Sequence, residues 1–181
     1  MIIILLLVLV AFVVLCLFAF PALSPIPYFP SNRADIGLIL NHIGLAKGNT
    51  IIDLGAGDGI VVMEAARKAL ELGLDTQFIA VEINPVLVMI LHVRRLLNPN
   101  RRRIHIVWGD LFKMDYKALT RGHKSVTVYL YVSPWLMKKI MDRLNDQITR
   151  YTLVSYMYPI DEHVKEVGRG VHPLYKKAFT N

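Results

Sequence analysis

The 181-residue sequence contains a single cysteine, Cys16, so a disulfide framework is excluded. Cysteine and histidine also form no cluster with metal-ligand spacing, and we therefore expect no bound metal. His42, His92 and His105 lie within helix or strand patterns. This placement favours structural or exposed histidines over a catalytic base.

Charge is absent from the first 32 residues, and the net charge of +7 belongs entirely to the chain from Arg33 onward. Residues 2–20 are apolar over about the 20 residues that a helix needs to cross a bilayer. No lysine or arginine precedes this run, and F-P-A-L at residues 20–23 is a poor cleavage site, so we predict a retained transmembrane anchor (residues 1–23) rather than a signal peptide. Because basic residues follow the anchor, we expect a single-pass membrane protein with its catalytic domain on the cytoplasmic side.

A proline-rich linker over residues 24–32 is expected next, with the folded domain spanning 33–181. The sequence P-Y-F-P-S at residues 27–31 is aromatic for a spacer. Two interpretations stay open. The aromatic side chains either anchor the chain at a lipid interface or belong to a segment that covers the active site.

The strongest motif is D-L-G-A-G-D-G, which follows an apolar run and precedes residues with helical spacing. It predicts a strand, a glycine turn and a helix, an arrangement that lets a ligand approach the backbone closely. The spacing is not the G-x-G-x-x-G of dinucleotide sites, and two carboxylates disfavour a pyrophosphate. They suit the amino group and sulfonium of S-adenosylmethionine (SAM), although an ordinary strand–helix turn is the alternative. The candidate cofactor-binding residues here are Asp53, Gly55, Ala56, Gly57, Asp58 and Gly59.

Polar residues also end the next two predicted strands. Glu82 ends strand 77–82 at the distance from Gly59 expected of an acid that binds ribose hydroxyls, and Ile83 and Asn84 follow it. Asp110 follows strand 104–108 and could accept a hydrogen bond from an adenine amino group, with Leu111 as an apolar wall. For each acid, a solvated position at the end of a strand is the alternative.

Strands alternate with helices along the domain, which predicts an α/β fold with a mostly parallel sheet and helices on both faces. Residues 163–167 and 174–179 predict a C-terminal antiparallel hairpin. Ligands in such sheets bind at the carboxyl ends of the strands. Four stretches that contain Asp53, Glu82, Asp110 and Ser133 should therefore meet at one edge.

With V-E-I-N-P and G-D-L-F, the glycine motif resembles those of the class I SAM-dependent methyltransferases, which have a Rossmann-like fold. More narrowly, the chain resembles the membrane-anchored protein-lysine methyltransferases that modify ATP synthase c-subunit and the adenine nucleotide translocase. The apolar N-terminus, P-Y-F-P-S, G-R-G at residues 168–170 and Tyr175 carry this likeness. Phe29 stands where that family usually has valine, and Tyr175 where tryptophan is common.

The resemblance implies methyl transfer from SAM to a lysine amine of a membrane-associated protein. An aromatic channel would lower the pKa of that lysine by desolvation. Tyr28, Tyr131 and Ser133 are candidates to orient the amine, and each could instead serve packing or a turn. Enzymes that methylate base amines carry Asn or Asp, then Pro-Pro and an aromatic residue, after the fourth strand. The sequence Y-V-S-P stands here, which argues against nucleic acid.

Other functions remain open at this point. They are methylation of a small or lipidic amine, methylation of RNA, and a non-catalytic SAM-fold module that binds a partner. The three arginines at residues 101–103 suit a solvated face, anionic lipid or RNA phosphates.

Overall fold

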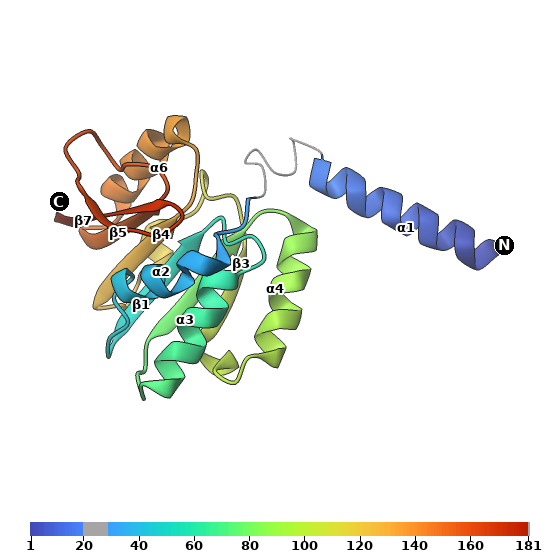
Figure 1. The fold of residues 1–181 in the computed structure, drawn as a ribbon, viewed down its shortest axis with the longest axis horizontal. Coiled ribbons are helices and arrows are strands. Elements are labelled where there is room, and N and C mark those ends of the chain that lie inside the picture. Colours follow the sequence, from blue (N-terminus) through green and yellow to red (C-terminus); the bar gives the residue numbers. More distant parts are fainter. Residues whose placement is uncertain (20–28, 181) are drawn as a thin grey trace.

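The computed structural model describes residues 1–19 and 29–180. A seven-stranded sheet in the order β3-β2-β1-β4-β5-β7-β6 forms its centre (Figure 1). The first five strands are parallel, β7 is antiparallel to β5, and β6 is antiparallel to β7. The strands are β1 (Asn49–Leu54), β2 (Gln77–Glu82), β3 (Ile104–Trp108), β4 (Ser125–Leu130), β5 (Arg150–Tyr156), β6 (Glu166–Arg169) and β7 (Pro173–Thr180).

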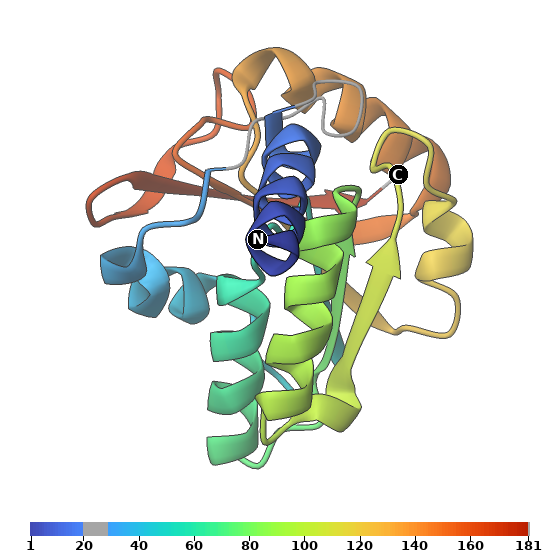
Figure 2. The same ribbon diagram turned by 90° about the vertical axis from the view of Figure 1, so that its right-hand side faces the viewer.

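Helices pack on both faces of the sheet, as the views in Figures 1 and 2 show. One face carries α2, α3 and α4, and the other carries α5 and α6. The α-helices are α1 (Ile2–Ala19), α2 (Ile36–His42), α3 (Ile60–Glu71), α4 (Pro85–Leu97), α5 (Tyr116–Leu119) and α6 (Pro134–Gln147). Two 3-10 helices are η1 (Arg33–Asp35) and η2 (Arg101–Arg103).

The alternation of side chains along each strand divides the apolar core into two layers. Ile51 of β1 faces the layer under α2, α3 and α4, whereas Ile52 faces the layer under α5 and α6. Both side chains are fully buried. A strand that is apolar on both faces is expected in the middle of a parallel sheet, and β1 lies between β2 and β4.

The predicted α/β architecture is confirmed, with its mostly parallel sheet and its C-terminal antiparallel strands. Local signals place the helix starts. Asn84 caps α4 by accepting hydrogen bonds from the amides of Val86 and Leu87, and Pro85 occupies the first helical position. Asn32 caps η1 in the same way through the amide of Ala34.

The predicted transmembrane anchor, and with it the single-pass localisation facing the cytoplasm, is wrong. Within residues 1–19 and 29–180, no helix has the combination of length and apolar character that a membrane span requires. The N-terminal helix α1 covers Ile2–Ala19. Residues 24–28 of the predicted linker, which include Tyr28, lie outside the described residues.

Candidate active site

The glycine turn between β1 and α3 has a backbone that only glycine adopts readily. Gly55, Gly57 and Gly59 all have positive φ, at 78°, 59° and 75°. The amides of Gly55 and Ala56 both donate to the carbonyl of Val81 at 2.9 Å, which ties the turn to β2. A Cβ on Gly59 would lie 2.3 Å from Cδ2 of Leu91, so the packing of α4 also requires glycine there.

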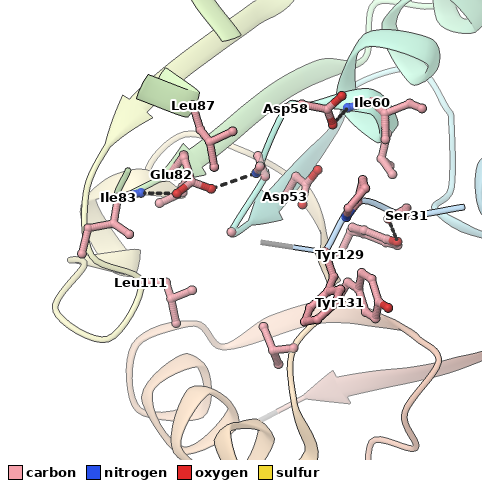
Figure 3. Close-up of a pocket in the computed structure, with 18 of the residues that line it drawn as sticks. Ser31, Asp53, Asp58, Ile60, Glu82, Ile83, Leu87, Leu111, Tyr129 and Tyr131 are labelled. Carbon is pink, nitrogen blue, oxygen red and sulfur yellow. Dashed lines mark hydrogen bonds between the residues drawn. The ribbon is translucent and has the colours of Figure 1, made fainter. Parts of the chain in front are cut away.

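A pocket opens beside this turn at the carboxyl ends of β1, β2 and β4 (Figure 3). It gathers most of the predicted site residues from separate stretches of the chain. Gly59, Asn84 and Ser133 are not among its lining residues. The predicted residues that line it are Asp53, Gly55, Ala56, Gly57, Asp58, Glu82, Ile83, Asp110, Leu111 and Tyr131.

Asp53 presents a buried carboxyl group to the pocket (Figure 3). Its side chain is 3% exposed, and within the described residues it has no hydrogen-bond or ion-pair partner. Burial, together with the negative charges of Glu82 and Asp58, raises the pKa of Asp53 to about 8. A cationic group in the pocket would reverse this effect, because it favours the ionised carboxylate.

Glu82 has the opposite surroundings, because three backbone amides donate to its carboxylate. Gly57 donates to Oε2 at 2.8 Å, and Ile83 and Asn84 each donate to Oε1 at 2.9 Å. The carboxylate therefore joins the glycine turn to the end of β2 in a fixed orientation (Figure 3). Asn84 itself is buried, and its side chain caps α4.

Asp58 and Asp110 line the pocket from two loops, one after β1 and one after β3. Asp58 accepts a hydrogen bond from the amide of Ile60 at 3.3 Å and forms an ion pair with Arg94 of α4. Asp110 accepts from the amide of Phe112 at 2.8 Å. These contacts fix the loops on which both carboxylates stand.

The loop after β3 is supported by α5, a four-residue helix that the sequence pattern did not predict. Its Tyr116 is fully buried and donates its hydroxyl to the carbonyl of Leu111. Leu111 is buried and lines the pocket, and its role as an apolar wall for the cofactor stays a prediction.

Aromatic and hydroxyl groups form the remaining wall. Tyr131 packs edge to face on Tyr156, with ring centroids 5.0 Å apart, and stacks on Tyr158 at 6.5 Å. Ser31 and Tyr129 form a buried hydrogen bond between their hydroxyls at 2.8 Å, and both residues line the pocket. Ser133 instead precedes the first turn of α6.

Sequence reasoning missed Ser31 and Tyr129 as site residues. Ser31 ends P-Y-F-P-S, a motif for which covering of the active site was one of two interpretations. Phe29, Pro30 and Ser31 do line the pocket, which puts this end of the segment over the site. Tyr129 carried no distinguishing signal, because aromatic residues are common in buried strands.

A second cavity adjoins the pocket and shares five lining residues with it, among them Ser31, Asp58 and Tyr131. Its other side is made by Asn32, Arg33 and His172. The pocket is therefore walled by glycines and carboxylates on one side, and on the other it meets a cavity with aromatic and basic residues. One side suits a cofactor and the other suits a second reactant.

The residues of the pocket fit SAM. Within the part of the chain that the structure describes, the carboxyl group of Asp53 has no partner, which matches a ligand that carries positive charge. The glycine turn admits a ligand close to the backbone. Nine residues predicted to bind the cofactor line this pocket: Asp53, Gly55, Ala56, Gly57, Asp58, Glu82, Ile83, Asp110 and Leu111.

Comparison with known proteins agrees with this geometry, although no family model matches the sequence. The chain is 24% identical to the ATP synthase c-subunit lysine N-methyltransferase of Caenorhabditis elegans over 171 residues, which cover 87% of this chain and 84% of that protein. Two solved structures share the fold. An RNA methyltransferase from Salinibacter ruber, in complex with S-adenosyl-L-homocysteine, has a TM-score of 0.69 and 22% identity over 84% of this chain and 94% of its own. The 23S rRNA methyltransferase ErmE has a TM-score of 0.59 and 15% identity over 85% of this chain and 70% of its own.

Sequence and fold together identify the chain as a class I SAM-dependent methyltransferase that resembles the lysine methyltransferases of the ATP synthase c-subunit.

Proposed function

We propose that this enzyme transfers methyl groups from SAM to a lysine side chain of a protein, with residues 33–181 as its catalytic domain. The observation that supports this proposal best is the cavity beside the cofactor pocket. Tyr131 and Ile60 line both spaces, and apart from Asp58, which Arg94 neutralises, no carboxylate lines the second cavity within the described residues. A lysine side chain could extend along such a wall with its alkyl stem on the apolar groups.

The walls also supply the chemistry that a lysine acceptor needs. A lysine amine is a nucleophile only when deprotonated, and its reference pKa is about 10.4. Removal of water by Tyr131, Ile60 and Pro30 disfavours the charged ammonium form and so lowers that pKa. When bound, SAM supplies a methyl group whose bond to sulfur breaks as the amine nitrogen bonds to it. The proton that lysine loses passes to solvent.

Hydroxyl groups are the orienting groups in this arrangement. The hydroxyls of Ser31 and Tyr129 already hydrogen-bond each other in the pocket, and that of Tyr131 contacts Sδ of Met157 at 3.5 Å, a weak interaction. We infer that Tyr131 turns its hydroxyl toward the incoming amine, while Ser31 and Tyr129 hold the segment above it. Tyr28 and Ser133 remain predictions as orienting groups.

The solved structures that share the fold include enzymes for RNA, so RNA is the competing substrate. The placement of charge speaks against it. Arg101, Arg102 and Arg103 form η2, directly before β3, whereas the pocket lies at the opposite, carboxyl end of the strands. The five residues of β3 separate the two ends by about 16 Å at 3.3 Å per residue. The arginines therefore lie at the amino end of β3, too far from the pocket to guide an RNA base into it.

The proposal is tested by incubating the full-length chain and SAM with a labelled methyl group. Three separate acceptors are used: recombinant ATP synthase c-subunit, total cellular RNA and a small-metabolite extract. A variant of the c-subunit with every lysine replaced by arginine keeps the charge of the acceptor and removes its lysine amines. Asp53→Ala in the enzyme is the control for cofactor-dependent transfer.

Label in the c-subunit that survives acid hydrolysis as methyl-lysine, and that disappears with either variant, is the expected result. Label found only in RNA or in small amines would overturn the lysine assignment. SAM binding without transfer to any of the three acceptors would favour a non-catalytic module.

A further inference from the structure

A second buried carboxylate, Asp35, lies outside the cofactor pocket and binds three groups from distant parts of the chain. Its side chain is 1% exposed. The hydroxyl of Tyr156 donates to Oδ2 at 2.6 Å, the amide of Val171 to Oδ1 at 2.7 Å and the amide of His172 to Oδ2 at 2.9 Å. The carboxylate thus joins η1, the end of β5 and the turn between β6 and β7.

The shape of that turn is built around Asp35. A Cβ on Gly170 would lie 2.0 Å from Oδ1 of Asp35, and one on Gly168 would lie 2.7 Å from Cδ1 of Leu38 in α2. The motif G-R-G at residues 168–170 has no part in the cofactor pocket, and the contact with the buried carboxylate of Asp35 explains the glycine at residue 170. The missing side chain lets the turn close directly onto the N-terminal segment of the domain.

One of the groups that Asp35 holds, His172, lines the second cavity, and another, Tyr156, packs against a residue that lines it. The ring of Tyr156 packs edge to face on Tyr131 at 5.0 Å and on His172 at 5.5 Å. Both Tyr131 and His172 line the cavity, and so does Arg33, two residues before Asp35. Asp35 therefore connects the wall made by residues 30–33 to the walls made by Tyr131, which follows β4, and by the turn.

We propose that Asp35 is a positioning residue for the methyl acceptor, which sets the spacing of the cavity walls through Tyr156 and the amides of residues 171 and 172. The acceptor-side role rests on the proposed function, because it assumes that the acceptor enters through this cavity. Asp35 does not line the cofactor pocket. Its loss should therefore affect the acceptor and leave the cofactor alone.

Asp161 provides a matched control at another place in the fold. Its carboxylate also holds a loop, since it accepts from the amides of His163 at 2.9 Å and Val164 at 3.1 Å and pairs with Lys177. It lines neither the pocket nor the second cavity. Asp161→Asn removes a similar set of charged hydrogen bonds without touching the cavity walls.

The experiment compares full-length wild type, Asp35→Asn, Tyr156→Phe and Asp161→Asn. Tyr156→Phe deletes one hydroxyl and keeps the ring on Tyr131, so it tests the same link if Asp35→Asn does not fold. Hydrogen exchange reports on residues 29–35, 129–137 and 168–173. Calorimetry gives the Kd of SAM, and steady-state transfer to the recombinant c-subunit gives kcat and KM.

For Asp35→Asn we expect faster exchange in all three segments, a Kd for SAM within twofold of wild type, and a kcat/KM for the acceptor at least tenfold lower. Tyr156→Phe should lower kcat/KM less, about threefold, because it removes one of the three donors to Asp35 and keeps the ring on Tyr131. Asp161→Asn should stay within twofold in both measurements. An equal loss of kcat/KM in Asp161→Asn, an equal loss of SAM affinity in Asp35→Asn, or faster exchange confined to residues 168–173 would each overturn the proposal.

The two proposals fail in distinguishable ways. If wild type methylates RNA or a small amine and leaves the c-subunit unlabelled, the lysine assignment fails, and the positioning role is measured on the acceptor that is used. If wild type methylates nothing, the exchange of the three segments decides whether Asp35 couples the walls. Unchanged exchange at residues 29–35 and 129–137 in Asp35→Asn would then refute it.

Discussion

Two buried aspartates of this enzyme, Asp53 and Asp35, have opposite surroundings. Both are almost fully buried, at 3% and 1% exposed. Asp53 has no hydrogen-bond donor within the described chain, and burial raises its pKa to about 8. Burial also opposes ionisation of Asp35, but hydrogen bonds from Tyr156, Val171 and His172 outweigh it and lower the pKa of Asp35.

The difference separates a binding carboxylate from a structural one. A buried charge that already has its donors adds stability to the fold. A buried carboxyl group without donors destabilises the fold when it ionises, and such a group is expected where a cationic ligand completes the site. The two residues differ in what the fold provides around them, since their side chains are the same.

The largest effect should come from Asp53→Asn, which keeps the shape of the side chain and removes its charge. A hydrogen bond to a charged group contributes about 1.5–3 kcal/mol, so we expect SAM to bind about 10–150-fold more weakly. Calorimetry with SAM measures this loss. Asp161→Asn makes the same change outside the pocket and should bind SAM as wild type does.

Asp53→Asn should not lower the stability of the fold, although it weakens the binding of SAM. At pH 9 the wild-type Asp53 is ionised with no partner among the described residues, so Asp53→Asn should unfold at equal or higher urea concentration than wild type. A variant that binds SAM normally, or one that loses stability at pH 9, would contradict the assignment of Asp53 as a binding carboxylate.

Asp35→Asn should reverse this pattern and lower the free energy of unfolding by about 2 kcal/mol. An amide has one acceptor oxygen and presents its NH₂ group to buried donors, which leaves part of their hydrogen bonding unsatisfied. Urea unfolding at pH 7 measures the change. If Asp35→Asn were as stable as wild type, Asp35 would not be the structural member of the pair.

The pH dependence of SAM binding gives a further test of the role of Asp53 as the binding carboxylate. The pKa of Asp53 is about 8 in the free protein, and a bound cation would lower it. Binding should therefore release a proton at pH 7, and affinity should rise by up to about tenfold per pH unit until about pH 8. Calorimetry at pH 7 in buffers of different ionisation enthalpy measures the protons released. Asp53→Asn should release none.

The direction in which each aspartate's pKa changes on folding determines how its contribution to stability depends on pH. The pKa of Asp53 is raised on folding, so its contribution to stability falls as pH rises from about 4 to about 8. The pKa of Asp35 is lowered, so it contributes stability above its unfolded value, 3.8, and loses that contribution as pH falls through its folded pKa. Unfolding of Asp53→Asn should therefore depend less on pH between 5 and 8 than that of wild type.

The two aspartates also show how far sequence reasoning reaches. Asp53 stands in a local motif of seven residues, and the same motif predicted the turn, the helix and the ligand class. The partners of Asp35 lie 121, 136 and 137 residues away, and no local pattern links them. In the sequence, Asp35 has the position of an acid in a first helical turn, which is why its role could only be found in the fold.

The difference between local and long-range signals also explains how other sequence predictions turned out. Strands 77–82 and 104–108 matched their predicted bounds, because long apolar runs define them. The helix α5 has only four residues, too few to show a helical period. The side chain of Asn84 caps α4, as an asparagine before a proline at a helix start indicates, and its role in cofactor binding stays a prediction.

The smallest effect is expected from Asp58→Asn, which tests how the charge around Asp53 sets its pKa. Asp58 is the weaker of the two carboxylates that raise this pKa, after Glu82. Its replacement also frees Arg94 from its ion pair, which leaves one more positive charge beside the turn. Both changes favour ionised Asp53, so the pH at which SAM affinity levels off should move below 8 by less than about one unit.

Calorimetric titrations from pH 6 to 9 locate the pH at which the affinity levels off. This pH does not depend on the absolute affinity, which the loss of Asp58 also reduces if this carboxylate contacts SAM. A shift to higher pH would mean that a group other than Asp53 controls the binding of the cation.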